Sequence, residues 1–220
     1  MPYPGCPPSR HRPKVYRIVR LESQLLAFCK LDSNPEYIAH EAGILERLAD
    51  LGCVPALVCQ TPNAIYTRYI EGKLLPEAIG SLGIRACIQA GWKILLITES
   101  IHKKGVVHSD LRPWNFIYGE DGQVYLIDFE YAYAYDQPDV LGLLKIHHGA
   151  RLKTAFSDWT DACGCVAKVW QASSYRILRW GLAPVLLVLY LAMHLLYRMR
   201  HPVDTLRAIV SRSFRKPFPA

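Results

Sequence analysis

The chain has 220 residues, of which 51% are hydrophobic and 20% are charged, a composition typical of a globular protein that buries a core. Its seven cysteines follow no regular framework and no secretory signal opens the chain. These features argue against a disulfide-bonded secreted protein and predict a cytoplasmic one. The C-x-C pair of Cys163 and Cys165 has no second pair that would complete a zinc site.

The formal net charge of +7 is unevenly distributed along the chain. Residues 1–20 and residues 198–220 contribute +5 each, whereas the middle of the chain carries a net −3. Basic ends indicate an anionic surface as partner, either lipid headgroups or nucleic acid, and of these we expect lipid. The alternative is that both ends are solvated tails.

The predicted secondary structure mixes strands and helices. Apolar-rich runs at 14–21 and 25–31 predict a β-hairpin. Asn34 before Pro35 marks the start of a helix, which should run to about Asp50. The later predicted elements are a strand at 64–70, a long helix at 83–104 ended by Gly105 in a left-handed conformation, a hairpin of 116–118 with 124–127, and mostly helix from residue 139 onward.

Three polar residues in two neighbouring segments have the spacing that phosphoryl transfer requires. Asp110, in the sequence His-Ser-Asp-Leu-Arg-Pro-Trp-Asn that begins at residue 108, can accept a proton from an attacking hydroxyl. Asn115, five residues later, and Asp128, after the apolar run 124–127, can hold Mg²⁺ against nucleotide phosphates. The transition state is highly charged, so positioning and charge neutralisation supply most of the catalysis.

The pattern H-x-D-x-x-x-x-N, followed by an apolar strand that ends in Asp-Phe, resembles the catalytic and metal-binding loops of the protein-kinase-like superfamily. The form H-S-D-L-R-P-W-N with L-I-D-F-E is most similar to compact atypical kinases, the lipopolysaccharide-core (Kdo) kinases and the RIO-type kinases. This resemblance implies ATP and Mg²⁺ as cofactors and an α+β, two-lobed fold with a truncated N-lobe and a mostly helical C-lobe. We expect the small N-lobe at 1–70, the catalytic C-lobe at 71–175, and an apolar helix with a basic tail at 176–220.

A lysine and a glutamate complete the expected phosphate-binding set. Lys30 closes the second predicted strand, and Glu41 shares the stripe of the next helix with Leu45 and Leu48. A carboxylate on an apolar stripe is costly unless it is paired, so we predict a Lys30–Glu41 ion pair that aims the ammonium at the nucleotide phosphates. The alternative is that Glu41 lies at the edge of the stripe, in water.

The strand that begins at residue 64 resembles the hinge between kinase lobes. The resemblance implies that Arg68 and Ile70 offer backbone groups to the adenine, and that Thr67 lies at the back of the nucleotide pocket.

The same resemblance assigns roles around the catalytic motif. Arg112, two residues after Asp110, is expected to neutralise the γ-phosphate, and His108 is expected to pack and form hydrogen bonds. Asp139 is expected to open a central helix of the C-lobe and to hydrogen-bond the catalytic loop. The short distance from Phe129 to Asp139 leaves no room for a long regulated activation loop.

Three positions depart from the protein-kinase pattern. No Gly-rich loop precedes Lys30, and Glu130 replaces the glycine that follows Asp-Phe. Ser109 replaces the arginine of kinases that phosphorylation switches on. Without a Gly-rich loop, the segment that covers the nucleotide phosphates would be weakened. A pseudokinase is therefore an alternative.

An uncharged run of seventeen residues, 181–197, lies between Arg176 and Arg179 on one side and Arg198 and Arg200 on the other. A bilayer span takes roughly twenty apolar residues, so the run is at the short limit. It is compatible with a buried helix of the C-lobe, with a helix that lies in a membrane interface, or with a span.

Together these patterns predict an ATP-dependent kinase that moves the γ-phosphoryl group to a hydroxyl acceptor, which could be a glycan, a small molecule or a protein. We expect a sugar of a lipid-linked glycan, reached from the inner face of the membrane. The alternatives are a RIO-like serine/threonine protein kinase and a pseudokinase that acts as a scaffold.

Overall fold

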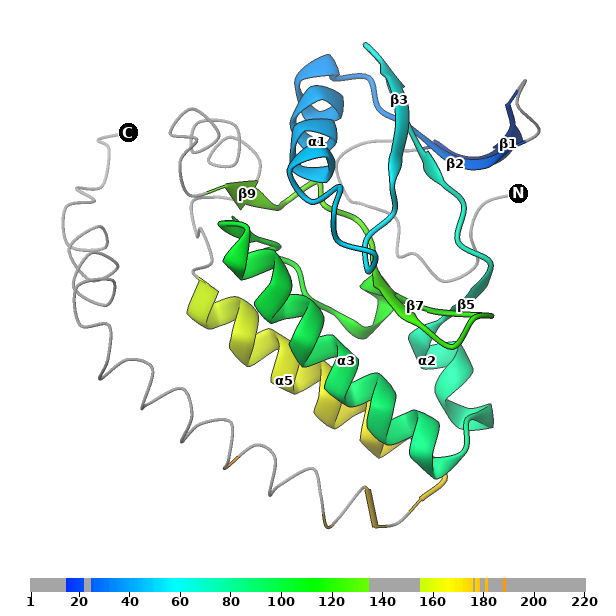
Figure 1. Cartoon of the computed structure of the whole chain (residues 1–220), viewed down its shortest axis with the longest axis vertical. Helices are drawn as coiled ribbons and strands as arrows, with labels where there is room; N and C mark the ends of the chain where they lie inside the picture. Colours follow the sequence, from blue (N-terminus) through cyan, green and yellow to red (C-terminus); the bar gives the residue numbers. More distant parts are fainter. Residues whose placement is uncertain are drawn as a thin grey trace, which may run out of the picture.

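The computed structural model describes residues 15–21, 25–134 and 155–175, together with positions 177, 178, 181 and 188. These residues form a small lobe dominated by an antiparallel sheet and a larger lobe dominated by helices (Figure 1). The predicted α+β, two-lobed architecture is therefore confirmed.

The small lobe is a four-stranded antiparallel sheet with one helix beside it. Its strands are β1 (Val15–Arg20), β2 (Leu26–Leu31), β3 (Leu57–Thr61) and β4 (Ala64–Arg68), in the spatial order β1-β2-β4-β3. The predicted hairpin is confirmed, because β1 pairs antiparallel with β2 along its whole length. Strand β4 pairs with the other edge of β2 and places Ile65 opposite Lys30.

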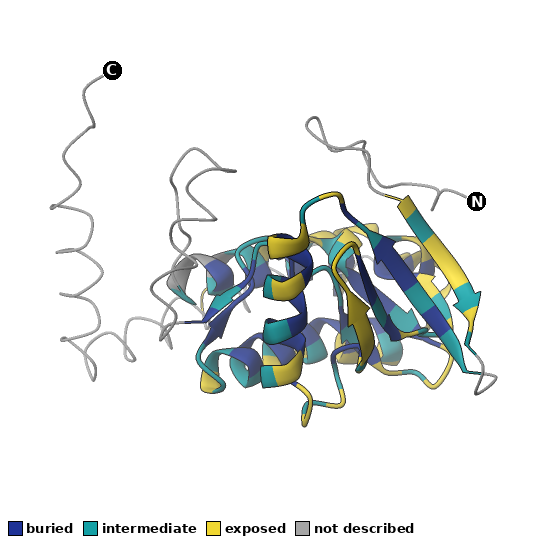
Figure 2. Cartoon of the chain, turned by 90° about the horizontal axis from the view of Figure 1, so that it is seen from above, coloured by how far each residue is buried: buried dark blue, intermediate teal, exposed yellow. Residues whose placement is uncertain are grey.

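Helix α1 (Pro35–Arg47) lies beside this sheet, with a buried face toward the protein and an exposed face outward (Figure 2). The Asn34 side chain caps the helix by accepting a hydrogen bond from the amide of Glu36 at 2.9 Å, as the sequence predicts. The helix ends earlier than Asp50, because Leu48 leaves helical geometry and is fully buried in the core.

The large lobe contains the remaining described elements. In chain order they are β5 (Gly72–Leu74), α2 (Leu75–Ala78), η1 (Ile79–Ser81), α3 (Ile84–Lys103), β6 (Val106–Val107), η2 (Pro113–Asn115), β7 (Phe116–Gly119), β8 (Val124–Leu126), β9 (Tyr133–Ala134) and α5 (Ala155–Ala172). The predicted second hairpin is confirmed as β7 and β8, which form a sheet with β5. Gly105, just after α3, has a φ of 73°, the left-handed geometry that its position predicts.

Helices α3 and α5 lie side by side and form much of the core of the large lobe (Figure 1). The indole of Trp170 on α5 is buried and donates a hydrogen bond to the carbonyl of Cys87 on α3 at 2.9 Å. A side chain at Gly91 would place its Cβ 2.6 Å from the Trp170 ring nitrogen, so glycine permits this close approach.

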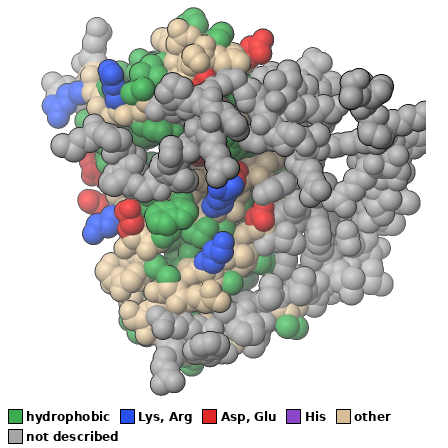
Figure 3. All heavy atoms as spheres, turned by 180° about the vertical axis from the view of Figure 1, so that it is seen from behind, with side chains coloured by type: hydrophobic (Ala, Val, Ile, Leu, Met, Phe, Trp, Pro, Cys, Tyr) green, Lys and Arg blue, Asp and Glu red, His purple; other side chains and the backbone are tan. Residues whose placement is uncertain are grey.

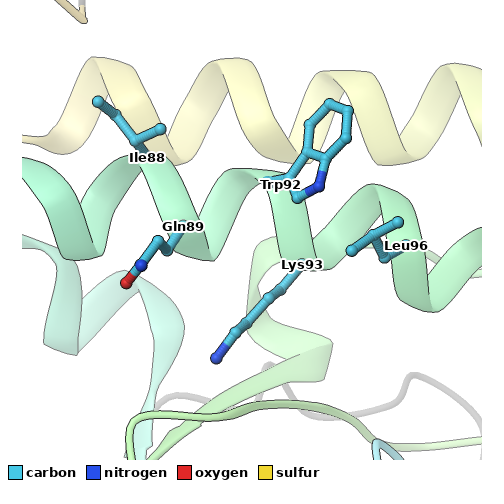
Figure 4. Close-up of a pocket in the computed structure, with 5 residues that line it drawn as sticks. All are labelled: Ile88, Gln89, Trp92, Lys93 and Leu96. Carbon is cyan, nitrogen blue, oxygen red and sulfur yellow. The ribbon is translucent and has the colours of Figure 1, made fainter.

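The opposite face of α3 exposes an apolar stripe. Ile84, Ile88, Trp92 and Leu96 recur every four residues on this face, and Trp92 is 54% exposed. Figure 4 shows three of these side chains projecting from the helix, with Gln89 and Lys93 beside them.

Much of the C-terminal region lies outside the described residues. From residue 139 onward the structure describes α5, the residues that follow it up to 175, and four later positions. The run 181–197 is described at Gly181 and Val188 alone, and Val188 is 65% exposed. Within the described residues, no helix is both long enough and apolar enough to cross a membrane.

Candidate active site

The catalytic motif forms a loop between β6 and β7 in which Asp110, Arg112 and Asn115 meet. The Asn115 amide nitrogen donates to the backbone carbonyl of Asp110 at 2.8 Å and lies 3.3 Å from its carboxylate Oδ2. Arg112 Nε lies 2.7 Å from Oδ1 of the same carboxylate, while the arginine side chain remains 63% exposed. The loop thus presents one carboxylate with an exposed cation beside it.

Two residues of the motif have left-handed backbone geometry. Ser109 has a φ of 66° and Asp128 has a φ of 65°. Such values are uncommon for residues with a Cβ and persist where the surrounding contacts impose them. Backbone strain is therefore concentrated next to Asp110 and at the predicted metal ligand.

His108 is buried and ties the catalytic loop to the metal-binding segment. Its Nε2 lies 3.0 Å from the carbonyl oxygen of Ile127, and its ring meets Phe129 edge-to-face with the ring centroids 4.9 Å apart. The Ile127 amide also donates to the carbonyl of Asn115 at 2.9 Å. These contacts agree with the packing role expected for His108, and they make Asn115 and Asp128 neighbours.

Asp158, in the first turn of α5, accepts hydrogen bonds from the backbone of the catalytic loop. Its carboxylate is fully buried and accepts hydrogen bonds from the backbone amides of His108 at 2.6 Å and Ser109 at 2.8 Å. His102 Nε2 lies 3.3 Å from the same carboxylate. Two amides of a strained loop thus receive a charged acceptor that the loop itself cannot supply.

This contact was expected from Asp139, which lies outside the described residues. Within the described residues Asp158 provides such a contact, and the role expected of Asp139 stays a prediction. The expectation that no long activation loop fits between Phe129 and Asp139 also falls on residues of which the structure describes only those up to 134, and it stays a prediction. The sequence contained a pattern that could have marked Asp158 as a buried residue. Asp158 shares a helical stripe with Ala162, Cys165 and Val169, which are all buried.

Lys30 lies at the centre of a buried charge cluster. Its ammonium contacts Glu41 Oε2 at 2.7 Å, which is the predicted ion pair, and Asp128 Oδ1 at 2.9 Å. A third carboxylate, Glu130 Oε2, also lies at 2.9 Å, and the sequence patterns did not predict it. The lysine from the small lobe thus meets the predicted metal ligand of the large lobe.

The charged groups in this cluster shift one another's pKa values. Burial by itself would lower the pKa of Lys30, but Asp128, Glu41 and Glu130 more than offset it and raise this pKa well above its usual value. Burial raises the pKa of Glu41, and the neighbouring Asp128 and Glu130 act in the same direction. Three carboxylates around one ammonium leave an excess of negative charge, which favours a cation at the open side of the cluster.

His40 connects α1 with the turn that follows the metal-binding segment. Its Nε2 lies 2.6 Å from the carbonyl oxygen of Ala132. Burial lowers the pKa of His40, although this hydrogen bond opposes the shift. The contact holds α1, and with it Glu41, against the large lobe.

The residues expected at the hinge lie where the two lobes join. Thr67 is buried in β4 opposite Phe28, and Arg68 is the exposed last residue of that strand. The amide of Arg68 donates to the carbonyl of Ala56 at 2.8 Å. Ile70 is half-buried in the short link between β4 and β5. Their positions suit the expected roles in nucleotide binding, which stay predictions.

The ligands at the loop suit Mg²⁺. Asp128 offers a carboxylate that is 31% exposed, and Asn115 anchors its amide nitrogen on Asp110, which leaves the amide oxygen for a metal. Mg²⁺ prefers oxygen ligands and is usually held by one or two protein groups together with waters and phosphates. Within the described residues, no cluster of three or more His, Cys, Asp and Glu side chains could hold a metal.

The two-lobed fold and the loop geometry define a protein of the protein-kinase-like class. The kinase PK-1 of Cydia pomonella granulovirus has a similar structure, with a TM-score of 0.53 at 16% sequence identity over 71% of this chain and 67% of that one. The family model of the RIO domain matches residues 22–147, more than half of the chain. The chain therefore belongs to the RIO domain family, one of the two groups that its motifs resemble.

Curated relatives with kinase names match shorter stretches. The probable serine/threonine-protein kinase PknB of Bifidobacterium longum is 32% identical over 108 residues, which are 48% of this chain and 14% of that protein. A probable serine/threonine-protein kinase of Clostridium perfringens is 35% identical over 81 residues, 36% of this chain and 12% of that protein. The chain thus spans only a small part of the length of these relatives.

Proposed function

We propose that this protein is an ATP- and Mg²⁺-dependent kinase that transfers the γ-phosphoryl group to a hydroxyl. The contact of Lys30 with both Glu41 and Asp128, at 2.7 and 2.9 Å, is the observation that carries the proposal. It joins the phosphate-binding lysine of the small lobe to the metal-binding segment of the large lobe, an arrangement that kinase chemistry needs. Thr67, Arg68 and Ile70 would receive the adenine.

Each site residue has a separate role in the proposed reaction. Lys30 would donate hydrogen bonds to the α- and β-phosphates, and Asn115 with Asp128 would hold Mg²⁺, which when bound supplies positive charge against the phosphate oxygens. Asp110 accepts the proton of the acceptor hydroxyl as the new oxygen–phosphorus bond forms and the bond from the γ-phosphorus to the β–γ bridging oxygen breaks, so that ADP leaves. Oδ2 is the oxygen proposed for this step, because its contact with the Asn115 amide at 3.3 Å is longer than that of Oδ1 with Arg112 at 2.7 Å. Arg112 then stabilises charge on the transferred group.

For the acceptor, we propose a serine or threonine hydroxyl of a protein. The relatives with serine/threonine-protein kinase names and the RIO domain match support this choice over the sugar of a lipid-linked glycan that the motifs first suggested. A screen with peptide and glycan acceptors separates the two, because only the accepted class yields a labelled product.

Nucleotide binding is the first test of this function. Mg²⁺–ATP at millimolar concentration should raise the melting temperature of the wild-type protein, because a ligand of the folded state stabilises it by about 2.7 kcal/mol at a hundred times its dissociation constant. Lys30→Ala or Asp128→Ala should abolish this shift, as each removes a charged group that would contact phosphate or metal.

The matched control is Lys73→Ala, which removes an exposed lysine of β5 and should keep the shift. The kinase proposal fails if the folded wild-type protein shows no shift at any nucleotide concentration. A shift without phosphoryl transfer to any acceptor would instead favour the pseudokinase alternative.

We also propose that the protein associates peripherally with anionic membranes through residues 176–200 and the basic end of the chain. Among the described residues of this stretch, Leu178 is buried, whereas Ile177 is 62% exposed and Val188 is 65% exposed. Apolar side chains exposed next to a basic segment suit a membrane interface. On the described part of the face in Figure 3, by contrast, basic and acidic side chains are interspersed.

Co-sedimentation with vesicles tests the membrane proposal. Binding should require anionic lipid and weaken as salt rises, since each Lys or Arg near the surface adds about 1 kcal/mol and exposed charges are screened over about 8 Å at physiological ionic strength. Val188→Asp should weaken binding, whereas the control Val58→Asp, on exposed β3, should not. Failure of the folded wild-type protein to bind anionic vesicles at low salt refutes the proposal.

A further inference from the structure

Glu130 gives Lys30 a second buried carboxylate at the position where the protein-kinase pattern has glycine. The residue sits in a tight turn, closed by the Ala132 amide donating to the carbonyl of Phe129 at 3.0 Å. The same Ala132 offers its carbonyl oxygen to His40 on α1 at 2.6 Å. The turn is thus anchored to α1, and it directs the Glu130 side chain into the charge cluster rather than into solvent.

Lys30 is in contact with three carboxylates, with two of them through hydrogen bonds and with Glu130 as an ion pair. A lysine ammonium has three N–H donors, and three carboxylate oxygens, from Glu41, Asp128 and Glu130, lie within 2.9 Å of Nζ. The side chains of Glu41 and Glu130 are 8% and 7% exposed, whereas that of Asp128 is 31% exposed. Two of the three contacts are therefore with buried partners, and the contact with Asp128 is at the more exposed side of the cluster.

We propose that Glu130 is a positioning residue that shares with Glu41 the task of holding the Lys30 ammonium, so that only its hydrogen bond to Asp128 is exchanged for one to a nucleotide phosphate. The inference rests on the kinase function proposed above. If a metal took up Oδ1 of Asp128, the ammonium would lose this contact and the donor would become available. Glu41 and Glu130 keep their contacts with the ammonium and fix the direction of the donor that Asp128 releases.

This arrangement makes the two buried glutamates partly redundant. If either one is neutralised, the other still provides a charge that compensates the buried ammonium. If both are neutralised, Asp128 alone compensates it, and nucleotide binding would then compete with the last counter-ion of Lys30. Removing the partners of a buried charge is strongly destabilising. The loss of nucleotide affinity in the double variant should therefore exceed the product of the losses in the two single variants.

The test is a double-mutant cycle of Glu41→Gln and Glu130→Gln in the full chain, with the dissociation constant of Mg²⁺–ADP as the readout. Gln keeps the size and an acceptor oxygen while removing the charge. Each single substitution should weaken binding about fivefold, and the double substitution more than about 100-fold, well beyond the product of the two. The control Glu46→Gln, exposed on the same helix as Glu41, should leave the constant unchanged.

A second measurement distinguishes a role through Lys30 from simple packing. With Lys30 present, Glu130→Gln should lower the melting temperature of the nucleotide-free protein, because Lys30 loses a charged partner. In a Lys30→Met background the same substitution should raise it, because the carboxylates then lack their cation and repel one another. A packing role would give the same sign in both backgrounds.

The outcomes separate this inference from the kinase proposal itself. If the wild-type protein does not bind Mg²⁺–ADP, the kinase proposal and the inference fail together. If wild type binds but the double substitution equals the product of the singles, or the melting shift keeps one sign, the inference alone is overturned.

Discussion

Asp110→Asn is expected to reduce phosphoryl transfer by about 10²–10⁴-fold while leaving nucleotide affinity nearly unchanged. Asparagine has almost the same shape, but it cannot accept the proton of the acceptor hydroxyl. Asp110 is not among the predicted metal ligands, and its contacts in the structure are with Arg112 and Asn115 of its own loop. The loss should therefore appear in kcat rather than in the dissociation constant of Mg²⁺–ATP.

A matched control for this substitution is Asp50→Asn. Asp50 is an exposed carboxylate that pairs with Lys104, so it also loses a cation contact when neutralised, but at the surface. Its turnover should equal that of the wild-type protein. Equal turnover of wild type and Asp110→Asn, with any accepted substrate, would rule out Asp110 as the base.

Asp158→Asn is expected to produce the largest loss of stability, about 3–5 kcal/mol in the free energy of unfolding. The carboxylate is fully buried and accepts two backbone hydrogen bonds, from His108 and Ser109. In the variant one acceptor oxygen becomes an NH₂ group, which faces a buried amide donor. Because typical domains are stable by only 5–15 kcal/mol, urea unfolding should show a large shift of the midpoint.

Glu99→Gln serves as the control, because it also turns an acid into its amide but at the surface. Glu99 is 43% exposed and pairs with Lys103 at 3.6 Å on α3. Exposed ion pairs of this kind contribute about 0.5 kcal/mol or less. If Asp158→Asn unfolds at the same urea concentration as wild type, the carboxylate does not hold the catalytic loop.

The sequence determined the parts of the site whose geometry is local. Asp110 and Asn115 belong to one loop, so their spacing along the chain sets their distance in space. Lys30 and Glu41 could be paired because a helix repeats every 3.6 residues and places Glu41 on the buried stripe. The hairpins, the cap at Asn34 and the left-handed Gly105 likewise follow from the preferences of neighbouring residues.

The tertiary structure decided which distant residues complete these local parts. The catalytic loop needs a buried acceptor for two amides, and the sequence pattern pointed to Asp139 for this role. The packing of α5 on α3, with Trp170 against Gly91, brings Asp158 to the loop. Glu130 enters the cluster of Lys30 because a turn anchored to α1 directs it there. A buried donor or charge requires a partner, but only the assembled fold selects which residue that partner is.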